Sequence, residues 1–158
     1  MKISELIPQD KIIPGLKGKN KEEIINELVD VFKNDKRVFD IDALRNDIFK
    51  RERIMSTGIG NGFAIPHCTT DVVKDFIAAF GKSSAPVDFD AIDNQPVILF
   101  YLIAGNNIKQ HMKLLSSIVK YMKDEVKEKL LRAGNAEEIL AVFKDFELKY
   151  PDKAELKS

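Results

Sequence analysis

Two histidines, His67 and His111, are the side chains of this sequence best suited to nucleophilic chemistry. A neutral imidazole is a nucleophile, and its unperturbed pKa near 6.5 keeps it mostly neutral at cellular pH. His67 closes a run, residues 51–67, that combines a cation, small hydroxyls and three alternating glycines. Pro66 stiffens the chain directly before the imidazole, so His67 is held by backbone that can hardly flex. This setting favours chemistry over packing for His67.

A phosphoryl group is the reactant that the surrounding residue types suit. In-line transfer to or from an imidazole nitrogen needs mainly orientation and stabilisation of the charge on the phosphoryl oxygens. Arg51 offers a forked cation, and His111 offers a hydrogen bond if it reaches the same pocket. The other candidate phosphate ligands are hydroxyls and backbone N–H groups, from Ser56, Thr57, Gly58 and Gly60.

These residues also have purely structural interpretations. His111 precedes Leu114 and Leu115 by three and four residues, so it lies on an inward-facing helical stripe, where a lone histidine is more often a core residue. Ser56-Thr57 taken alone indicates a turn or a helix cap. Arg51 at the end of a helix also complements the helix dipole. The functional interpretation therefore requires that the fold bring these residues together.

Other chemistries find fewer of the residues that they need. Cys68 follows His67 directly, and neighbours in extended chain point to opposite faces, so Cys68 is expected to be a buried filler rather than a nucleophile. Two histidines with one badly aimed cysteine are too few for zinc, and no dense carboxylate cluster near them suggests Mg²⁺ or Ca²⁺. Gly81-Lys82-Ser83 imitates the end of a P-loop, but Phe76 stands where that motif requires glycine.

The composition narrows the class of protein. The chain has 158 residues, which suit one domain, and its 25 basic side chains balance 25 acidic ones. Zero formal net charge argues against a nucleic-acid partner held by bulk charge. Cys68 is the single cysteine, which fits a reducing compartment, and neither a membrane-span-length apolar run nor a signal peptide is recognisable. We therefore expect a soluble, cytoplasmic protein without membrane insertion.

Capping residues and hydrophobic periodicity predict five helices. They are expected over about residues 21–33 after Asn20, from Asp40 to the Lys50-Arg51 pair, from Ile108 through Met122, over 124–131, and after Asn135.

Apolar runs predict strands at Phe63–Ile65, Phe76–Phe80 and Val97–Ile103, and the last is apolar on both faces and therefore central. Lys11–Ile13 is either an edge strand or the entry to a turn, and residues 83–94 are expected to be a connection. Helices interleaved with short strands predict an α/β layer fold. Residues 1–150 form its single domain, and residues 151–158 are a polar tail.

The run Arg51-Glu52-x-x-x-Ser56-Thr57-Gly58-Ile59-Gly60-Asn61-Gly62-x-Ala64-Ile65-Pro66-His67 closely resembles a known signature. It is that of the fructose/mannitol-type enzyme IIA domain of the bacterial phosphoenolpyruvate-dependent sugar phosphotransferase system. The likeness reaches about residue 143 and continues in Met1–Leu6, Pro96-Val97, His111–Leu115 and Ala136–Leu140.

The resemblance implies a mixed β-sheet surrounded by helices and a phosphotransferase that works as a phosphocarrier. The family's phosphorylated histidine falls on His67, its assisting arginine on Arg51 and its second active-site histidine on His111. The implied donor is the phosphohistidine of the carrier HPr, and the implied acceptor is a cysteine on a IIB component for sugar uptake. No metal or organic cofactor is implied.

The same domain type also serves as a phosphorylation-state sensor of the nitrogen-related kind, which acts by binding other proteins. That regulatory role remains an alternative because a sensor needs the same histidine. Two departures from the family pattern stand near the site. Ala104–Asn107 forms a shortened loop before His111, and Cys68 replaces a small residue.

Overall fold

A mixed β-sheet forms the centre of the molecule. The structure is a computed structural model that describes residues 2–151, and within them six strands pair in the order β1-β5-β6-β3-β2, with β4 also paired to β6. The expected α/β fold with helices flanking a mixed sheet is confirmed. The polar tail expected at residues 151–158 lies, apart from Pro151, outside the described residues. The strands are β1 (Ile12–Leu16), β2 (Gly58–Gly60), β3 (Phe63–Ala64), β4 (His67–Thr69), β5 (Phe76–Val87) and β6 (Val97–Gly105).

β6 is the central strand, as its two-sided apolar sequence predicts. It runs antiparallel to β5 and parallel to both β3 and β4, while β1 lies parallel to β5 at the edge. Alternate residues of β6 point into two separate cores, with Tyr101 and Ile103 in one and Leu102 and Ala104 in the other. The sheet therefore needs helices on both faces.

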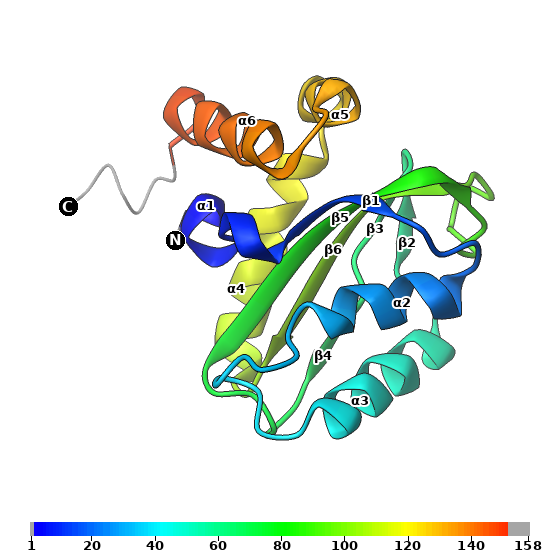
Figure 1. Ribbon diagram of the computed structural model, residues 1–158, viewed down its shortest axis with the longest axis vertical. Coiled ribbons are helices and arrows are strands. Elements are labelled where there is room, and N and C mark those ends of the chain that lie inside the picture. The colour runs from blue at the N-terminus through cyan, green and yellow to red at the C-terminus, as the bar shows by residue number, and fades with distance from the viewer. Residues whose placement is uncertain (1, 152–158) are drawn as a thin grey trace.

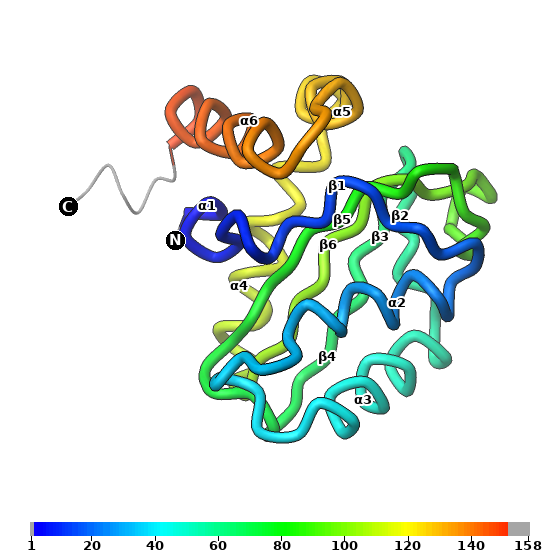
Figure 2. The backbone as a smooth tube through the Cα atoms, in the orientation of Figure 1, coloured from blue at the N-terminus to red at the C-terminus, as the bar shows by residue number. Residues whose placement is uncertain are grey.

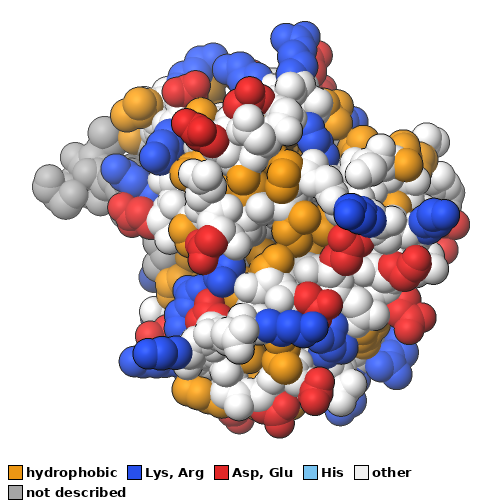
Figure 3. Space-filling model, viewed as in Figure 1, with side chains coloured by type: hydrophobic (Ala, Val, Ile, Leu, Met, Phe, Trp, Pro, Cys, Tyr) orange, Lys and Arg blue, Asp and Glu red, His pale blue; other side chains and the backbone are white. Residues whose placement is uncertain are grey.

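The helices cover the sheet in two groups (Figures 1 and 2). On one face α2 (Lys21–Asp30) and α3 (Ile41–Ile54) pack side by side. The other face carries α1 (Ile3–Leu6), α4 (Ile108–Val119), α5 (Asp124–Arg132) and α6 (Ala136–Lys149), with short 3₁₀ turns at Gln9–Lys11 and Lys120–Met122. Among residues 2–151, no helix combines the length and the apolar character that crossing a membrane requires. On the surface in Figure 3, cationic and anionic side chains are interspersed.

Side-chain caps begin α2, α3 and α6 at the residues that the sequence predicts, and a further cap, Asn107, begins α4. The side chain of Asn20 accepts a hydrogen bond from the Glu23 amide, and Asp40, Asn107 and Asn135 make the corresponding bonds at α3, α4 and α6. Each cap satisfies an N–H group that the first turn leaves unpaired. α2 is shorter than expected, since it ends at Asp30 and turns lead to Asn34, whose φ is 69°.

Several other boundaries differ from those that the sequence predicts. α3, expected to end at Lys50-Arg51, continues to Ile54. The connection expected at residues 83–94 begins as strand, because β5 continues to Val87, which pairs with Val97. The helix expected through Met122 ends at Val119 and tightens into a 3₁₀ turn. The apolar piece at Lys11–Ile13 is an edge strand that extends through Pro14-Gly15, where a missing N–H and a missing side chain are tolerated.

Lys82, which stands in the discarded P-loop likeness, has a structural role instead. Its ammonium group reaches the end of α5 and donates to the carbonyl oxygens of Leu130 and Leu131, both at 3.2 Å, and to that of Ala133. The last carbonyls of a helix have no partner within it and carry the negative end of the dipole. The lysine therefore ties β5 to α5.

We expect Lys82→Met to lower the free energy of unfolding by about 1 to 2 kcal/mol, because these carbonyls lose a charged donor. Urea unfolding followed by circular dichroism measures the change. Lys74→Met, at an exposed position, is the control and should leave the urea midpoint unchanged. Equal midpoints for Lys82→Met and wild type would contradict the assigned role.

Candidate active site

His67 begins β4, directly after the Ile65-Pro66 step that separates this strand from β3. β4 is held by β6, where His67 pairs with Ile103. Cys68 points into the core beneath α2 and α3 and is only 5% exposed, whereas the side chain of His67 is half-buried. Burial raises the pKa of the Cys68 thiol to about 12. The prediction that Cys68 is a buried filler is confirmed.

A hydrogen bond fixes the imidazole of His67. Its Nδ1 lies 2.7 Å from the carbonyl oxygen of Ile65. A carbonyl oxygen only accepts hydrogen bonds, so Nδ1 must carry the proton. In the neutral ring, Nε2 is then the nitrogen with a free lone pair. The backbone thus selects both the orientation and the tautomer of the ring.

The second imidazole lies beside the first. The ring centroids of His67 and His111 are 5.3 Å apart, with an angle of 36° between the planes. The shortened loop therefore still delivers His111 to the site, in the first turns of α4, whose cap is Asn107. His111 is 5% exposed, and its Nδ1 is buried without a hydrogen-bond partner. This orphan nitrogen sets His111 apart from an ordinary core histidine.

Both imidazoles favour the neutral form. Burial lowers the pKa of His67, and the charge of Arg51 adds to this effect, against the opposing effect of the hydrogen bond to Ile65. Burial, with a contribution from His67, lowers the pKa of His111 to about 4. A neutral imidazole is the form that can act as a nucleophile.

Arg51 and both histidines line one open hollow of about 400 Å³. The guanidinium belongs to the last turn of α3 and donates from Nη1 to the carbonyl oxygen of Met55, at 2.8 Å. α4 lines the hollow with one of its faces, through Ile108, His111, Met112 and Leu115. The complete lining comprises Asp47, Lys50, Arg51, Ile54, His67, Cys68, Thr69, Ile108, His111, Met112 and Leu115.

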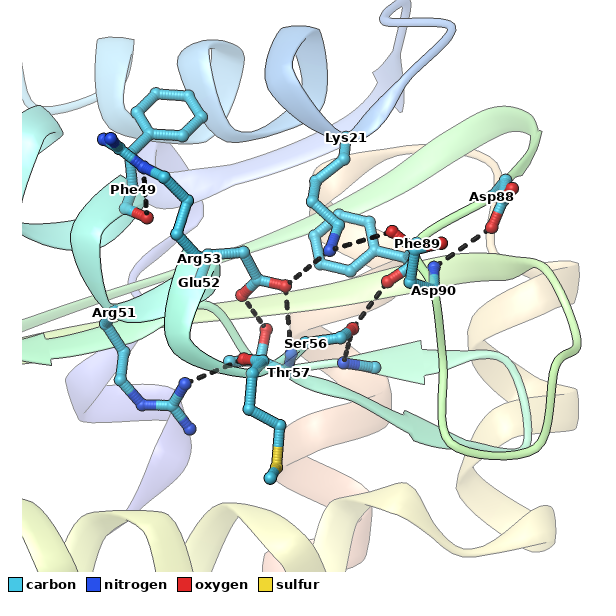
Figure 4. A network of polar contacts seen from close by, with 12 residues as sticks. Lys21, Phe49, Arg51, Glu52, Arg53, Ser56, Thr57, Asp88, Phe89 and Asp90 are labelled. Carbon is cyan, nitrogen blue, oxygen red and sulfur yellow. Dashed lines mark hydrogen bonds and ion pairs between the residues drawn. The ribbon is translucent and has the colours of Figure 1, made fainter.

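The expected phosphate ligands of the glycine run are not brought to this hollow. The hydroxyl of Thr57, which is 2% exposed, donates to Glu52 Oε2 at 2.6 Å. Ser56 Oγ donates to the Phe89 carbonyl at 2.5 Å and accepts from the Gly58 amide at 3.0 Å. Figure 4 shows Thr57 and Ser56 turned toward these partners and Arg51 turned away from Glu52. Placing these hydroxyls on a phosphate was therefore wrong for this structure.

The glycines serve the backbone instead. A side chain at Gly58 would meet Ala91 at 2.8 Å, and Gly60 has a φ of 102° beside Asp93. Only glycine adopts such a φ without strain. The alternating glycines thus let β2 turn tightly into β3 and approach the loop at residues 91–93.

A partly apolar surface around His67 is expected from the sequence, but the residues that form the apolar rim of the hollow were not predicted. Ile54, Ile108 and Met112 are 79%, 70% and 57% exposed although each is strongly hydrophobic. Their signal in the sequence is an apolar residue on the polar side of an amphipathic helix. Among residues 2–151, no group of three or more histidine, cysteine, aspartate or glutamate side chains is arranged to hold a metal ion.

Fold and site together define an α/β protein with two facing imidazoles and a guanidinium at one edge of a mixed sheet. The family model described as "Phosphoenolpyruvate-dependent sugar phosphotransferase system, EIIA 2" matches residues 5–146. The chain therefore belongs to this family of phosphotransferase-system phosphocarriers, as its signature predicts.

Known relatives carry two kinds of name. The fructose-specific EIIABC component from Bacillus subtilis (strain 168) is 36% identical over 147 residues, which are 90% of this chain and 23% of that protein. The chain thus spans less than a quarter of that relative's length. The fructose-specific EIIA component from Haloferax volcanii is 34% identical over 142 residues, 87% of this chain and 91% of that protein.

The other kind of relative is a nitrogen regulatory protein, and one has a solved structure. Nitrogen regulatory protein IIA-Ntr from Neisseria meningitidis matches with a TM-score of 0.81 and 29% identity, over 89% of this chain and 98% of that one. The family is therefore established, and membership alone does not choose between transport and regulation.

The lowered pKa values predict a dependence of stability on pH. Histidines that stay neutral when folded take up protons near pH 6.5 when unfolded, so folding stability falls as pH drops from about 6.5 toward 4. Replacing His111 by leucine should remove about 1 to 2 kcal/mol of the loss between pH 7.5 and pH 5. Urea unfolding of wild type and variant at both pH values measures this difference. An NMR titration midpoint of His111 near 6.5 would contradict the prediction.

Proposed function

We propose that this protein accepts a phosphoryl group from the phosphohistidine of HPr onto Nε2 of His67, and passes it to a cysteine of a IIB component. The observation that carries the proposal is the hydrogen bond from Nδ1 to Ile65, which leaves Nε2 unprotonated in a hollow shared with Arg51 and His111. The proposal treats residues 1–150 as the carrier domain and places it in the cytoplasm.

The transfer requires little covalent chemistry from the protein. The lone pair of Nε2 forms the new P–N bond while the bond to the donor nitrogen breaks, and that electron pair returns to the donor. Negative charge remains on the three phosphoryl oxygens. Arg51 neutralises part of it, since the guanidinium has five N–H donors and Met55 engages one nitrogen. The ring of His111, beside that of His67 in the same hollow, offers a further donor.

The second transfer reverses these roles. A cysteine thiolate of the acceptor attacks phosphorus, the P–Nε2 bond breaks, and its electrons return to the His67 ring. Because Nδ1 retains its bond to Ile65, the ring does not have to reorient between the two steps.

The exposed apolar rim supports docking of two proteins in turn. Ile54 on α3 faces the hollow from one side, and Ile108 and Met112 on α4 face it from the other. Exposed apolar side chains grouped around a reactive residue are typical of protein interaction sites. HPr and the IIB component are therefore proposed to share this rim, which makes their binding mutually exclusive.

A regulatory role is the second candidate, because the Neisseria meningitidis relative at 29% identity is named a nitrogen regulatory protein. In that role the phosphorylated and unphosphorylated forms would bind a target protein differently. Incubating the phosphorylated protein with IIB components from the same organism distinguishes the two. Rapid loss of label to a IIB cysteine supports transport, whereas retained label supports regulation.

The His67→Ala variant is expected to take up no label from phosphoenolpyruvate in the presence of enzyme I and HPr, because the bond-forming nitrogen is absent. Wild-type protein should be labelled at His67, as mass spectrometry of alkaline-stabilised peptides would show. Near-wild-type circular dichroism of the variant is the folding control. Phosphoryl label that still appears in a folded His67→Ala variant would contradict the assignment of His67 as the nucleophile.

Arg51→Gln should slow phosphoryl transfer from HPr roughly 100- to 1000-fold, because a charged donor to the phosphoryl oxygens is lost. Single-turnover labelling with rapid quenching measures the rate constant. Arg53→Gln is the matched control, since Arg53 is exposed two residues further along α3 and donates to the Phe49 carbonyl instead. Equal rate constants for the two variants would contradict the role of Arg51.

A further inference from the structure

Glu52 is a buried carboxylate next to Arg51 that the proposed chemistry does not use. It is 6% exposed and lies on the side of α3 facing away from the hollow. Its oxygens accept hydrogen bonds from the Thr57 amide at 2.9 Å and the Thr57 hydroxyl at 2.6 Å, and one lies 3.0 Å from Lys21 Nζ (Figure 4). Burying a charge is unfavourable unless partners satisfy it. The partners present here define a specific local structure.

Hydrogen bonds connect Thr57 to His67. The carbonyl oxygen of Thr57 accepts the amide of Ile65 at 3.0 Å. The carbonyl oxygen of Ile65 in turn accepts the Nδ1 proton of His67 at 2.7 Å. The position of the reactive imidazole thus depends on where Ile65 lies, and Ile65 depends on Thr57.

The same contacts hold Arg51. Glu52 and Thr57 close the short segment between the last turn of α3 and β2. Met55 lies inside this segment, and its carbonyl oxygen receives the Nη1 bond of Arg51 at 2.8 Å. One carboxylate therefore fixes the backbone on which both the cation and the nucleophile rest.

Lys21 provides the balancing charge from another element. It is the first residue of α2, and its ammonium group lies 3.0 Å from Glu52 and 3.7 Å from Asp90. It also stands 4.8 Å above the ring of Phe89. The lysine side chain is 24% exposed and that of Glu52 only 4%, so the pair is well shielded from solvent. α2 is thereby linked to a site that it does not touch.

We propose that Glu52 and Thr57 are positioning residues that set the geometry of His67 and Arg51 for phosphoryl transfer, with Lys21 as the cation that stabilises the ionised Glu52. The inference rests on the proposed function for its kinetic consequence only. The geometric part, that Thr57 orients the His67 ring, can be tested without any phosphoryl donor.

Thr57→Val removes the hydroxyl and keeps the shape of the side chain, whereas Thr57→Ser keeps the hydroxyl. In ¹⁵N-histidine-labelled protein, we expect Thr57→Val to broaden or shift the Nδ1–H resonance of His67, because Ile65 moves. Thr57→Ser should retain the wild-type resonance. The control is Ser83→Ala, which removes another buried hydroxyl, bonded only to the Ala85 backbone among the described contacts. An unchanged Nδ1–H resonance in Thr57→Val would overturn the inference.

Kinetics test the functional part. At saturating phosphorylated HPr, the single-turnover rate constant of Thr57→Val should fall roughly 10- to 100-fold, since a small misplacement of the reacting imidazole has an effect of this size. The HPr concentration for half-maximal rate should stay near that of wild type, because the docking rim is intact. Thr57→Ser should recover most of the rate. Equal losses in both variants, or a loss confined to HPr affinity, would overturn the inference.

Lys21→Met provides an independent test that leaves Thr57 unchanged. It should lower the transfer rate because Glu52 loses its ion-pair partner. Adding Glu52→Gln should make the double variant faster than Lys21→Met alone, since a neutral amide needs no balancing cation. A double variant whose loss equals the product of the two single losses would contradict the coupling. If wild-type protein takes no label, the proposed function fails, and the NMR comparison alone decides whether Thr57 orients His67.

Discussion

The hydrogen bond from Nδ1 of His67 to the Ile65 carbonyl is the interaction on which the site depends. It joins a side chain to the two-residue segment between β3 and β4. That segment is itself bonded to Thr57 through the Ile65 amide and to β6 through the Pro66 carbonyl, so the ring is held by well-anchored backbone. Only Ile65 and Pro66 separate β3 from β4, and both strands pair with β6. Pro66 restricts the backbone of this short connection, which helps to keep the Ile65 carbonyl beside the His67 ring. The His67 ring therefore lies at the junction between β3 and β4, which pair one after the other with β6.

Burial and charge then act on an imidazole whose position is already set. A ring in open water would exchange tautomers and protons freely, whereas here the backbone acceptor and the partial burial favour one neutral form. Arg51 contributes twice, because its charge disfavours a protonated His67 and favours anionic oxygens beside it. The same cation thus prepares the nucleophile and the site of the group that it would carry.

The sequence predicted the parts of the site that depend on single residues with unusual chemistry. Both histidines and Arg51 lie together as expected, and the capped helices and the central strand are correct. The hydroxyls of Ser56 and Thr57 were misassigned because the choice between a phosphate and a protein acceptor depends on tertiary contacts. The Phe89 carbonyl that accepts the Ser56 hydroxyl lies 33 residues further along the chain. Glu52, which accepts the Thr57 hydroxyl, is only five residues away, and the two side chains meet because α3 ends between them. The sequence around Ser56 does not indicate that Phe89 lies next to it in the fold.

Under the proposed function, the apolar rim would also influence how long each complex lasts. Three exposed side chains around a hollow of about 400 Å³ offer a small contact area, and contact areas of this kind form short-lived encounters more readily than permanent assemblies. Under the proposed function, brief residence is an advantage, because each partner must leave before the next one binds. Weak binding is then a kinetic requirement, and a larger apolar surface would slow phosphoryl transfer because one partner would dissociate too slowly.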